Sequence, residues 1–162
     1  MNKIPKLKYP IRLDIACGFF QWKKDDGYIG IDMRDFGQEI VWDVTKGLPL
    51  PDNSVKEFFC SHLLEHLTFS QAVELFKEIW RVGIDISALE LRVPSLTNRD
   101  AQAGDHKTIY TATVIEYMLR EFNKEKDSPY SFIYPSLKET EMAPYDEVQA
   151  EIIIIKKDNP GG

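Results

Sequence analysis

Two short apolar runs near the N-terminus limit the choice of fold more than any other part of the sequence. Residues 13–18 (LDIACG) end in a turn of small residues, and residues 28–32 (YIGID) end in a carboxylate. Both have the composition of buried β-strands. Gly18 lets backbone N–H groups approach a ligand closely, and Asp32 stands where it can bind ribose hydroxyls. The pair therefore predicts a nucleotide pocket at the ends of two strands.

The residues that follow Gly18 disfavour a hydride-transfer cofactor. A dinucleotide fingerprint, G-x-G-x-x-G, needs further glycines at this place, whereas Phe19, Phe20 and Gln21 stand there. A different nucleotide-dependent enzyme that uses the same pocket remains an alternative.

Alternating strand and helix patterns predict an α/β fold. Seven apolar runs have strand character: residues 11–17, 28–32, 39–42, 55–60, 88–93, 130–134 and 148–155. Helical periodicity covers residues 71–82, with Ser70 as the N-cap, and residues 113–122. We expect a three-layer sandwich with a seven-strand, mostly parallel, Rossmann-like sheet. The last two strands, separated by the polar residues 135–147, are expected to pair as an antiparallel hairpin.

The connection between the first two strands is shortened. Too few residues lie around Asp25, Asp26 and Gly27 for the crossover helix that normally joins parallel strands. We expect an irregular or single-turn connection, which leaves one side of the sheet exposed.

One domain accounts for the length and composition of the chain. We expect it to cover residues 1–162, with residues 1–10 as an N-terminal arm and residues 159–162 as a frayed tail. Hydrophobic residues make up 43% of the chain, but no run is long enough to span a bilayer. The basic N-terminus lacks the apolar segment of a signal peptide, which predicts a cytoplasmic protein.

The net charge and the positions of the cysteines disfavour two further classes, nucleic-acid-binding proteins and disulfide-bonded proteins. The formal net charge of −6 disfavours nucleic-acid binding, because neutralising phosphates requires a basic surface. Cys17 and Cys60 each close an apolar strand. This position favours buried, reduced thiols over a disulfide, and a catalytic thiol remains the alternative.

Two further motifs follow downstream. Residues 43–54 read D-x-T-x-G-L-P-x-P-D-N-S, and residues 61–67 read S-H-x-L-E-H-L. Together with the two apolar runs, they stand in the order found in class I S-adenosylmethionine-dependent methyltransferases. From about Ile11 to Pro94 the chain resembles small members of that class related to the type 11 group. The resemblance implies S-adenosylmethionine as the cofactor and methyl transfer as the reaction.

The chain departs from the family pattern at two places. Ala16 replaces the usual first glycine of the turn after the first strand, and residues 83–88 replace a Lys-Pro-Gly-Gly turn. The first departure bears on cofactor affinity. The second is expected to alter only a turn far from the pocket.

The resemblance places the nucleoside part of the cofactor at the ends of the second and third strands. Asp32 accepts hydrogen bonds from both ribose hydroxyls, the alternative being a cap of the turn after its strand. Asp43 accepts one from the adenine amino group, the alternative being a loop cap. Met33 and Val44 enclose the adenine ring.

The amino-acid head of the cofactor is assigned to the ends of the first and fourth strands. Gly18 offers its backbone beside Ala16, and Asp14 orders this turn or binds the ammonium through water. Ser61 and His62 close the fourth strand, where a backbone carbonyl commonly holds the ammonium in the resembling families. The shortened connection leaves the methionine end of this pocket exposed.

An acceptor hydroxyl needs a base, and His106 is the candidate catalytic residue. It lies in a polar loop after the fifth strand, where Asp105 is placed to orient its imidazole; the alternative is a surface-loop histidine. His62 and His66 have the spacing of a metal pair on a helix, but a third ligand is missing, so we expect no metal.

The sequence therefore predicts transfer of a methyl group to a small-molecule or sugar/glycan acceptor, at oxygen. No lid domain is inserted, so a second subunit is the candidate wall of the acceptor site, and a homodimer is expected. The competing hypothesis is a non-catalytic module that binds S-adenosylmethionine for a regulatory or structural purpose.

Overall fold

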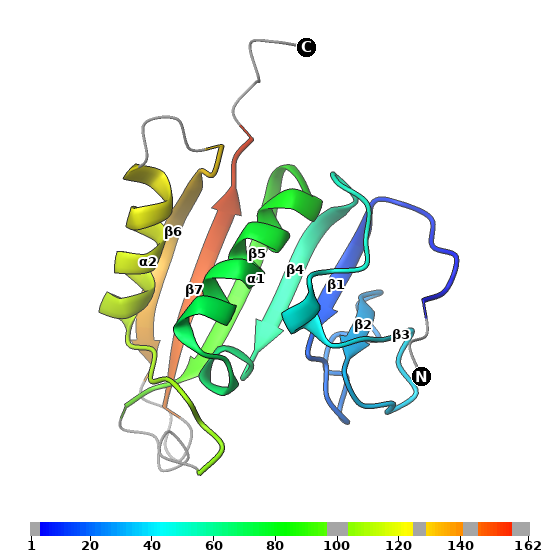
Figure 1. Ribbon diagram of the computed structural model, residues 1–162, viewed down its shortest axis with the longest axis horizontal. Helices are drawn as coiled ribbons and strands as arrows, with labels where there is room; N and C mark the ends of the chain where they lie inside the picture. The colour runs from blue at the N-terminus through cyan, green and yellow to red at the C-terminus, as the bar shows by residue number, and fades with distance from the viewer. Residues whose placement is uncertain (1–3, 97–103, 125–128, 141–145, 157–162) are drawn as a thin grey trace.

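The computed structural model describes residues 4–96, 104–124, 129–140 and 146–156, and its centre is a seven-stranded sheet (Figure 1). The tail at residues 159–162 and the first three residues of the arm lie outside this part. In chain order the elements are β1 (Ile11–Ile15), β2 (Ile29–Asp32), β3 (Ile40–Val41), η1 (Val44–Lys46), β4 (Val55–Ser61), η2 (Leu64–His66), α1 (Phe69–Val82), β5 (Gly83–Pro94), α2 (Ala112–Lys124), β6 (Phe132–Thr140) and β7 (Glu147–Ile154).

The strand order is β3-β2-β1-β4-β5-β7-β6. The first five strands run parallel, and β7 is antiparallel to both β5 and β6. The predicted Rossmann-like sheet with a late antiparallel hairpin is thus confirmed. Ile15 pairs with Ile31 on one side and with Cys60 on the other, so the carboxyl ends of β1, β2 and β4 meet at one edge.

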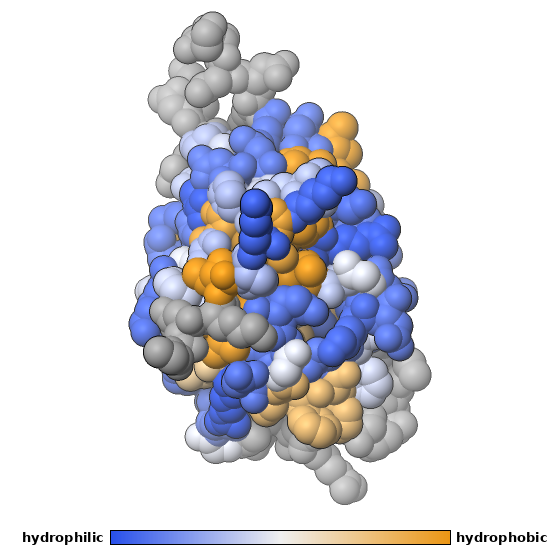
Figure 2. All heavy atoms as spheres, turned by 90° about the vertical axis from the view of Figure 1, so that its right-hand side faces the viewer, coloured by the Kyte–Doolittle hydropathy of each residue, from blue (hydrophilic) through white to orange (hydrophobic). Residues whose placement is uncertain are grey.

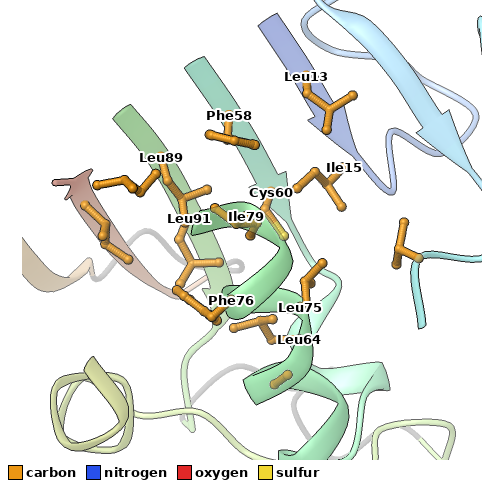
Figure 3. Packing of buried hydrophobic residues seen from close by; sticks show 14 of the residues in the cluster. Leu13, Ile15, Phe58, Cys60, Leu64, Leu75, Phe76, Ile79, Leu89 and Leu91 are labelled. Atoms are coloured by element: carbon orange, nitrogen blue, oxygen red, sulfur yellow. The ribbon is translucent and has the colours of Figure 1, made fainter. Parts of the chain in front are cut away.

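The helices bury one face of the sheet. Phe76 in α1 contacts Phe122 in α2, with ring centroids 6.2 Å apart, and Phe132 in β6 at 5.9 Å. Both helices therefore lie on the same side, in front of the sheet in Figure 1. Figure 3 shows apolar side chains from three neighbouring strands directed toward α1: Leu13, Ile15, Phe58, Cys60, Leu89 and Leu91.

The opposite face carries charged side chains in place of a second helical layer. Arg12 pairs with Glu57 at 3.0 Å, and Arg92 pairs with Glu90 at 2.6 Å, all four being about one third exposed. Lys23, from the β1–β2 connection, reaches Glu90 at 3.3 Å. In the described part of the chain, this irregular connection is all that remains of a third layer on that face. The shortened β1–β2 connection predicted such an exposed side of the sheet.

The start of α1 differs from the prediction. Thr68, not Ser70, is the N-cap: its side chain accepts from the Gln71 backbone N–H, and the Gln71 side chain accepts from the Thr68 N–H. This capping box satisfies two backbone donors at once, whereas Ser70 lies inside the first turn.

Two other boundaries differ because tertiary pairing extends the strands. Residues 83–88, expected as a turn, belong to β5: Gly83 pairs with Val55, and the extra residues form an irregularity with Ile86 at φ 58°. β6 continues to Thr140, inside the expected polar separator, because its residues pair with β7 as far as Glu147. As an edge strand, β6 can carry polar side chains into solvent.

Arg81 of α1 holds the loop of the D-x-T-x-G-L-P-x-P-D-N-S motif. Its guanidinium donates to the carbonyl oxygens of Leu48 at 2.9 Å and Leu50 at 3.0 Å. It also pairs with Asp52 and Glu78, each at 2.7 Å. Much of this motif therefore serves to dock the loop on α1.

We expect Arg81→Ala to lower the free energy of unfolding by about 2–3 kcal/mol, because two carbonyls and two carboxylates lose a charged donor. Urea denaturation measures the loss, and Lys77→Ala, on the same helix, is the control. A change under about 0.5 kcal/mol, the range of ordinary surface substitutions, would contradict this role.

None of the described helices has the length and apolar character needed to cross a membrane.

Candidate cofactor and acceptor site

The turn after β1 is joined to the end of β2 by the Asp32 side chain. Its Oδ2 accepts a hydrogen bond from the Gly18 N–H at 3.1 Å, and its Oδ1 accepts one from the Arg34 N–H at 2.9 Å. Gly18 has a φ of 59°. The structure thus brings together the predicted glycine turn and the predicted acidic residue at the carboxyl edge of the sheet.

Ala16, in the same turn, also has a left-handed backbone, with a φ of 58°. This conformation strains any residue that has a Cβ and explains why a glycine is usual at this position.

We expect Ala16→Gly to raise the free energy of unfolding by up to about 1 kcal/mol, because relief of strain outweighs the added freedom of the unfolded chain. Binding of S-adenosylhomocysteine, measured by calorimetry, should be equal or tighter. A marked loss of affinity would show that the pocket is built around the alanine.

Asp14 is buried beneath this turn, with 4% of its surface exposed. Burial raises the pKa of its carboxyl to about 6, opposed by a backbone hydrogen bond from Lys23 and by the Lys23 charge, while the charge of Asp32 adds to the rise. Asp14 is therefore a carboxyl group that changes its charge in a mildly acidic range.

The predicted adenine side is formed by the ends of β2 and β3. Asp32 pairs with Val41, so Met33 and Asp43 follow neighbouring strand ends. Met33 is 67% exposed, whereas Val44 is buried in the core. The structure gives Asp43 the loop-capping role: its Oδ1 accepts from the Thr45 N–H at 3.1 Å and from the Thr45 hydroxyl at 2.7 Å, which lowers the Asp43 pKa.

Ser61 and His62 lie at the end of β4, as predicted. His62 has a φ of 54°. Its imidazole lies between two carboxylates, with Nε2 2.8 Å from Glu147 and Nδ1 3.3 Å from Glu65. These neighbours, Glu65 first, raise the His62 pKa to about 9. The ring is therefore engaged with Glu147 of β7 and Glu65 of η2.

A cluster of polar side chains lies just beyond, where η2 meets the loop that precedes α2. One ligand-type atom from each of Glu65, His66 and His106 lies within 4.8 Å of the other two. The two imidazole rings meet edge to face, with centroids 4.8 Å apart. Asp105, expected to orient His106, instead forms an ion pair with Nδ1 of His66 at 3.3 Å.

An exposed aromatic group borders the turn at Gly18. Phe19, Phe20 and Trp22 are 73%, 71% and 73% exposed, and their rings contact one another at 5.5 Å and 5.3 Å between centroids. Figure 2 shows apolar atoms in the middle of this face and also at its lower end, which is the end at which β1 and β4 terminate in Figure 1.

Solved structures with this architecture are numerous, although their sequences differ widely. A methyltransferase of Archaeoglobus fulgidus described as dependent on S-adenosylmethionine is 18% identical, with a TM-score of 0.64 over 90% of this chain and 85% of that one. One from Mesorhizobium loti, described in the same way, is 13% identical, with a TM-score of 0.63 over 93% of both chains.

A third structure is phosphoethanolamine N-methyltransferase 1 of Haemonchus contortus, in complex with phosphoethanolamine and S-adenosylhomocysteine. It is 15% identical, with a TM-score of 0.69 over 96% of this chain but 41% of that one. The protein has a class I methyltransferase fold. No protein-family model and no curated protein matches the sequence.

Within this methyltransferase fold, the sequence did not predict the grouping of His66 with His106. The E-H pair at residues 65–66 and the polar loop at residue 106 were visible separately, but 40 positions separate the two histidines. The contact follows from docking of the loop on η2, where the Glu65 carbonyl accepts from the Lys107 N–H at 2.7 Å.

A groove of about 520 Å³ lies on the helical side of the methyltransferase fold. Its lining belongs to α1, α2 and the segment before β6 and includes Phe69, Tyr117 and Tyr130, but none of the predicted site residues. The candidate site is therefore the carboxyl edge of the sheet rather than this groove.

Proposed function

We propose that the protein binds S-adenosylmethionine and transfers its methyl group to the oxygen of a small-molecule or glycan acceptor. The observation that carries this proposal is the hydrogen bond between the Gly18 turn and the Asp32 carboxylate at the carboxyl edge of a methyltransferase fold. In open parallel sheets, ligands bind at this edge, where the strand order reverses.

The nucleoside part of the cofactor is assigned to the ends of β2 and β3. Asp32 accepts hydrogen bonds from the two ribose hydroxyls, a task suited to the two oxygens of a carboxylate. Met33 and Val44 flank the adenine, and the Asp43 carboxylate accepts from its amino group while capping η1.

The amino-acid head is assigned to the turn after β1 and to the end of β4. Ala16 and Gly18 provide the backbone surface, and the ionised carboxylate of Asp14 attracts the ammonium. The backbone carbonyl groups of Ser61 and His62 complete this side.

Methyl transfer from a sulfonium is an in-line displacement that depends mainly on holding the acceptor close and aligned. A hydroxyl acceptor must also lose its proton at or just after transfer, and we assign this step to His106. His106 lies in the loop that docks on η2, directly before Lys107, whose N–H donates to the Glu65 carbonyl.

Two observations bear on the acceptor. The phosphoethanolamine methyltransferase of similar fold is solved with a small acceptor molecule, and the net charge of −6 opposes a nucleic-acid substrate. The exposed aromatic group Phe19, Phe20 and Trp22 supplies an apolar wall beside the turn, and a second copy of the chain is the proposed cover for the rest.

Titration of the purified protein with S-adenosylmethionine, S-adenosylhomocysteine and NAD tests this proposal. We expect both sulfur compounds to bind, and the product to bind at least as tightly as the substrate. Binding of the pair without turnover on any acceptor would favour the non-catalytic module. Binding of NAD alone would overturn the proposal in favour of another nucleotide-dependent enzyme.

Cofactor affinity should depend on pH through Asp14. Because the pKa of this carboxyl in the folded protein is about 6, its charge is lost below that pH. Affinity for S-adenosylhomocysteine should therefore rise roughly tenfold between about pH 5 and pH 7, as the ionised carboxylate becomes available to the ammonium.

Asp14→Asn is the matched variant for this test. It should bind more weakly at pH 7 and show a flat profile. The folded carboxyl has a raised pKa, so its contribution to stability is present below about pH 4 and is lost as the pH rises through about 6. The Asn variant should consequently be at least as stable as the parent at pH 7. If the affinity of Asp14→Asn depended on pH as it does in the parent, Asp14 would not be part of the site.

A further inference from the structure

We propose that Glu65, His66 and His106 form a binding site for a divalent transition-metal ion of the zinc class. The three residues offer one carboxylate oxygen and two imidazole nitrogens, all within 4.8 Å of one another. Ligand atoms around a tetrahedral zinc ion lie about 3.3 Å apart, so a small rotation of the two half-exposed imidazoles completes the geometry.

The Glu65 carboxylate gives an independent reason to expect a cation. Glu65 is 2% exposed, and among the described residues neither of its side-chain oxygens accepts a hydrogen bond. The nearest positive group is His62, whose Nδ1 lies 3.3 Å from Oε1, within ion-pair distance but without hydrogen-bond geometry. A buried carboxylate with unused acceptor capacity is costly, and coordination to a cation satisfies it.

The backbone holds the two halves of the cluster together before any ion binds. The Glu65 carbonyl accepts from the N–H groups of Lys107 at 2.7 Å and Thr108 at 3.3 Å, and the Thr108 hydroxyl donates to the Leu67 carbonyl at 2.9 Å. His106 is therefore fixed beside His66 by its own loop. Such positioning lowers the entropy lost when a ligand binds.

Asp105 has the position of an outer-shell partner. Its Oδ2 lies 3.3 Å from Nδ1 of His66. When Nδ1 donates to this carboxylate, the lone pair available for a metal is on Nε2. A carboxylate that orients a metal-binding histidine in this way is a recurrent feature of zinc sites. Asp105, which the sequence assigned to His106, thus acquires a positioning role.

The ligand set selects the ion. Magnesium and calcium prefer oxygen ligands, whereas two imidazoles and one carboxylate suit zinc and neighbouring transition metals. Three protein ligands also leave a coordination position open to an oxygen ligand, and a bound cation lowers the pKa of such a group. On the proposed function, that ligand would be the acceptor oxygen. In the metal-bound protein His106 would hold the ion, and the acceptor proton would pass to water; in the metal-free protein the imidazole accepts it, as proposed above.

Equilibrium dialysis of the untagged protein against Zn²⁺, followed by metal analysis, tests the site. We expect one equivalent to bind to the parent and at least a hundredfold weaker binding in His66→Gln and His106→Gln. Asp105→Asn should weaken binding roughly tenfold or more. Co²⁺ provides a second readout, since its visible absorption should indicate a tetrahedral site with nitrogen and oxygen ligands.

His62→Gln is the matched control, because it removes the third histidine of the chain, which pairs with Glu65 but is not one of the proposed ligands. This variant should still bind one Zn²⁺. Absence of stoichiometric binding in the parent would overturn the site, and so would unchanged binding in both His66→Gln and His106→Gln.

Binding of S-adenosylhomocysteine is measured on the same samples. It should persist in His66→Gln and His106→Gln, because the proposed cofactor contacts lie elsewhere. Loss of Zn²⁺ with retained cofactor binding supports the metal site, whereas Zn²⁺ binding without any cofactor binding would refute the proposed function and leave the metal site intact.

Discussion

Replacing Asp32 by alanine should weaken binding of S-adenosylhomocysteine by more than tenfold. The carboxylate is expected to accept hydrogen bonds from both ribose hydroxyls. In the structure it also accepts hydrogen bonds from the Gly18 N–H at 3.1 Å and the Arg34 N–H at 2.9 Å. The variant therefore loses its direct contacts with the ligand and also the hydrogen bond to Gly18 that shapes the turn. Isothermal titration calorimetry at neutral pH measures the effect.

Asp43→Ala is the matched control for this prediction. Its carboxylate caps η1 through Thr45, and adenine keeps backbone partners, so the loss of affinity should be smaller. The circular dichroism spectrum of the Asp32 variant should match that of the parent. If Asp32→Ala bound S-adenosylhomocysteine as tightly as the parent, Asp32 would not be part of the site. A larger loss of affinity in Asp43→Ala than in Asp32→Ala would show that Asp43 is the more important of the two contacts.

Replacing His106 by alanine should lower turnover on the methyl acceptor by roughly a hundredfold or more, the usual contribution of a positioned acid–base group. Loss of a metal ligand at the same position predicts an effect in the same direction. Affinity for S-adenosylhomocysteine should stay unchanged. Once an acceptor is identified, single-turnover transfer of a labelled methyl group provides the measurement.

Lys107→Ala serves as the control for His106. The Lys107 side chain is exposed in the same loop, and its contact with η2 is made by the backbone N–H, which the substitution keeps. Near-parent turnover in His106→Ala would mean that catalysis depends only on holding the two substrates close together. His106 would then be a surface-loop histidine without a catalytic role.

The parts of the site that depend on short stretches of chain could be predicted from the sequence. The run that ends at Gly18 and the run that ends at Asp32 are each defined by apolar residues next to a special residue, and parallel pairing brings their ends together. The left-handed backbone of Ala16 likewise agrees with the glycine expected at that position.

The remaining features depend on tertiary contacts that no local pattern contains. Thr68 competes with Ser70 as a cap, and only the reciprocal bond with Gln71 decides between them. Asp105 is adjacent to His106 in sequence, yet its ion pair is with His66, because the loop docks on η2.

A crystal structure of the protein with S-adenosylhomocysteine bound would show whether the cofactor lies at the carboxyl edge of the sheet. We expect the ribose hydroxyls within hydrogen-bonding distance of the Asp32 carboxylate and the amino-acid head against the turn that contains Ala16 and Gly18. A ligand bound in the groove between α1 and α2, or at the sheet edge with its ribose away from Asp32, would contradict this expectation.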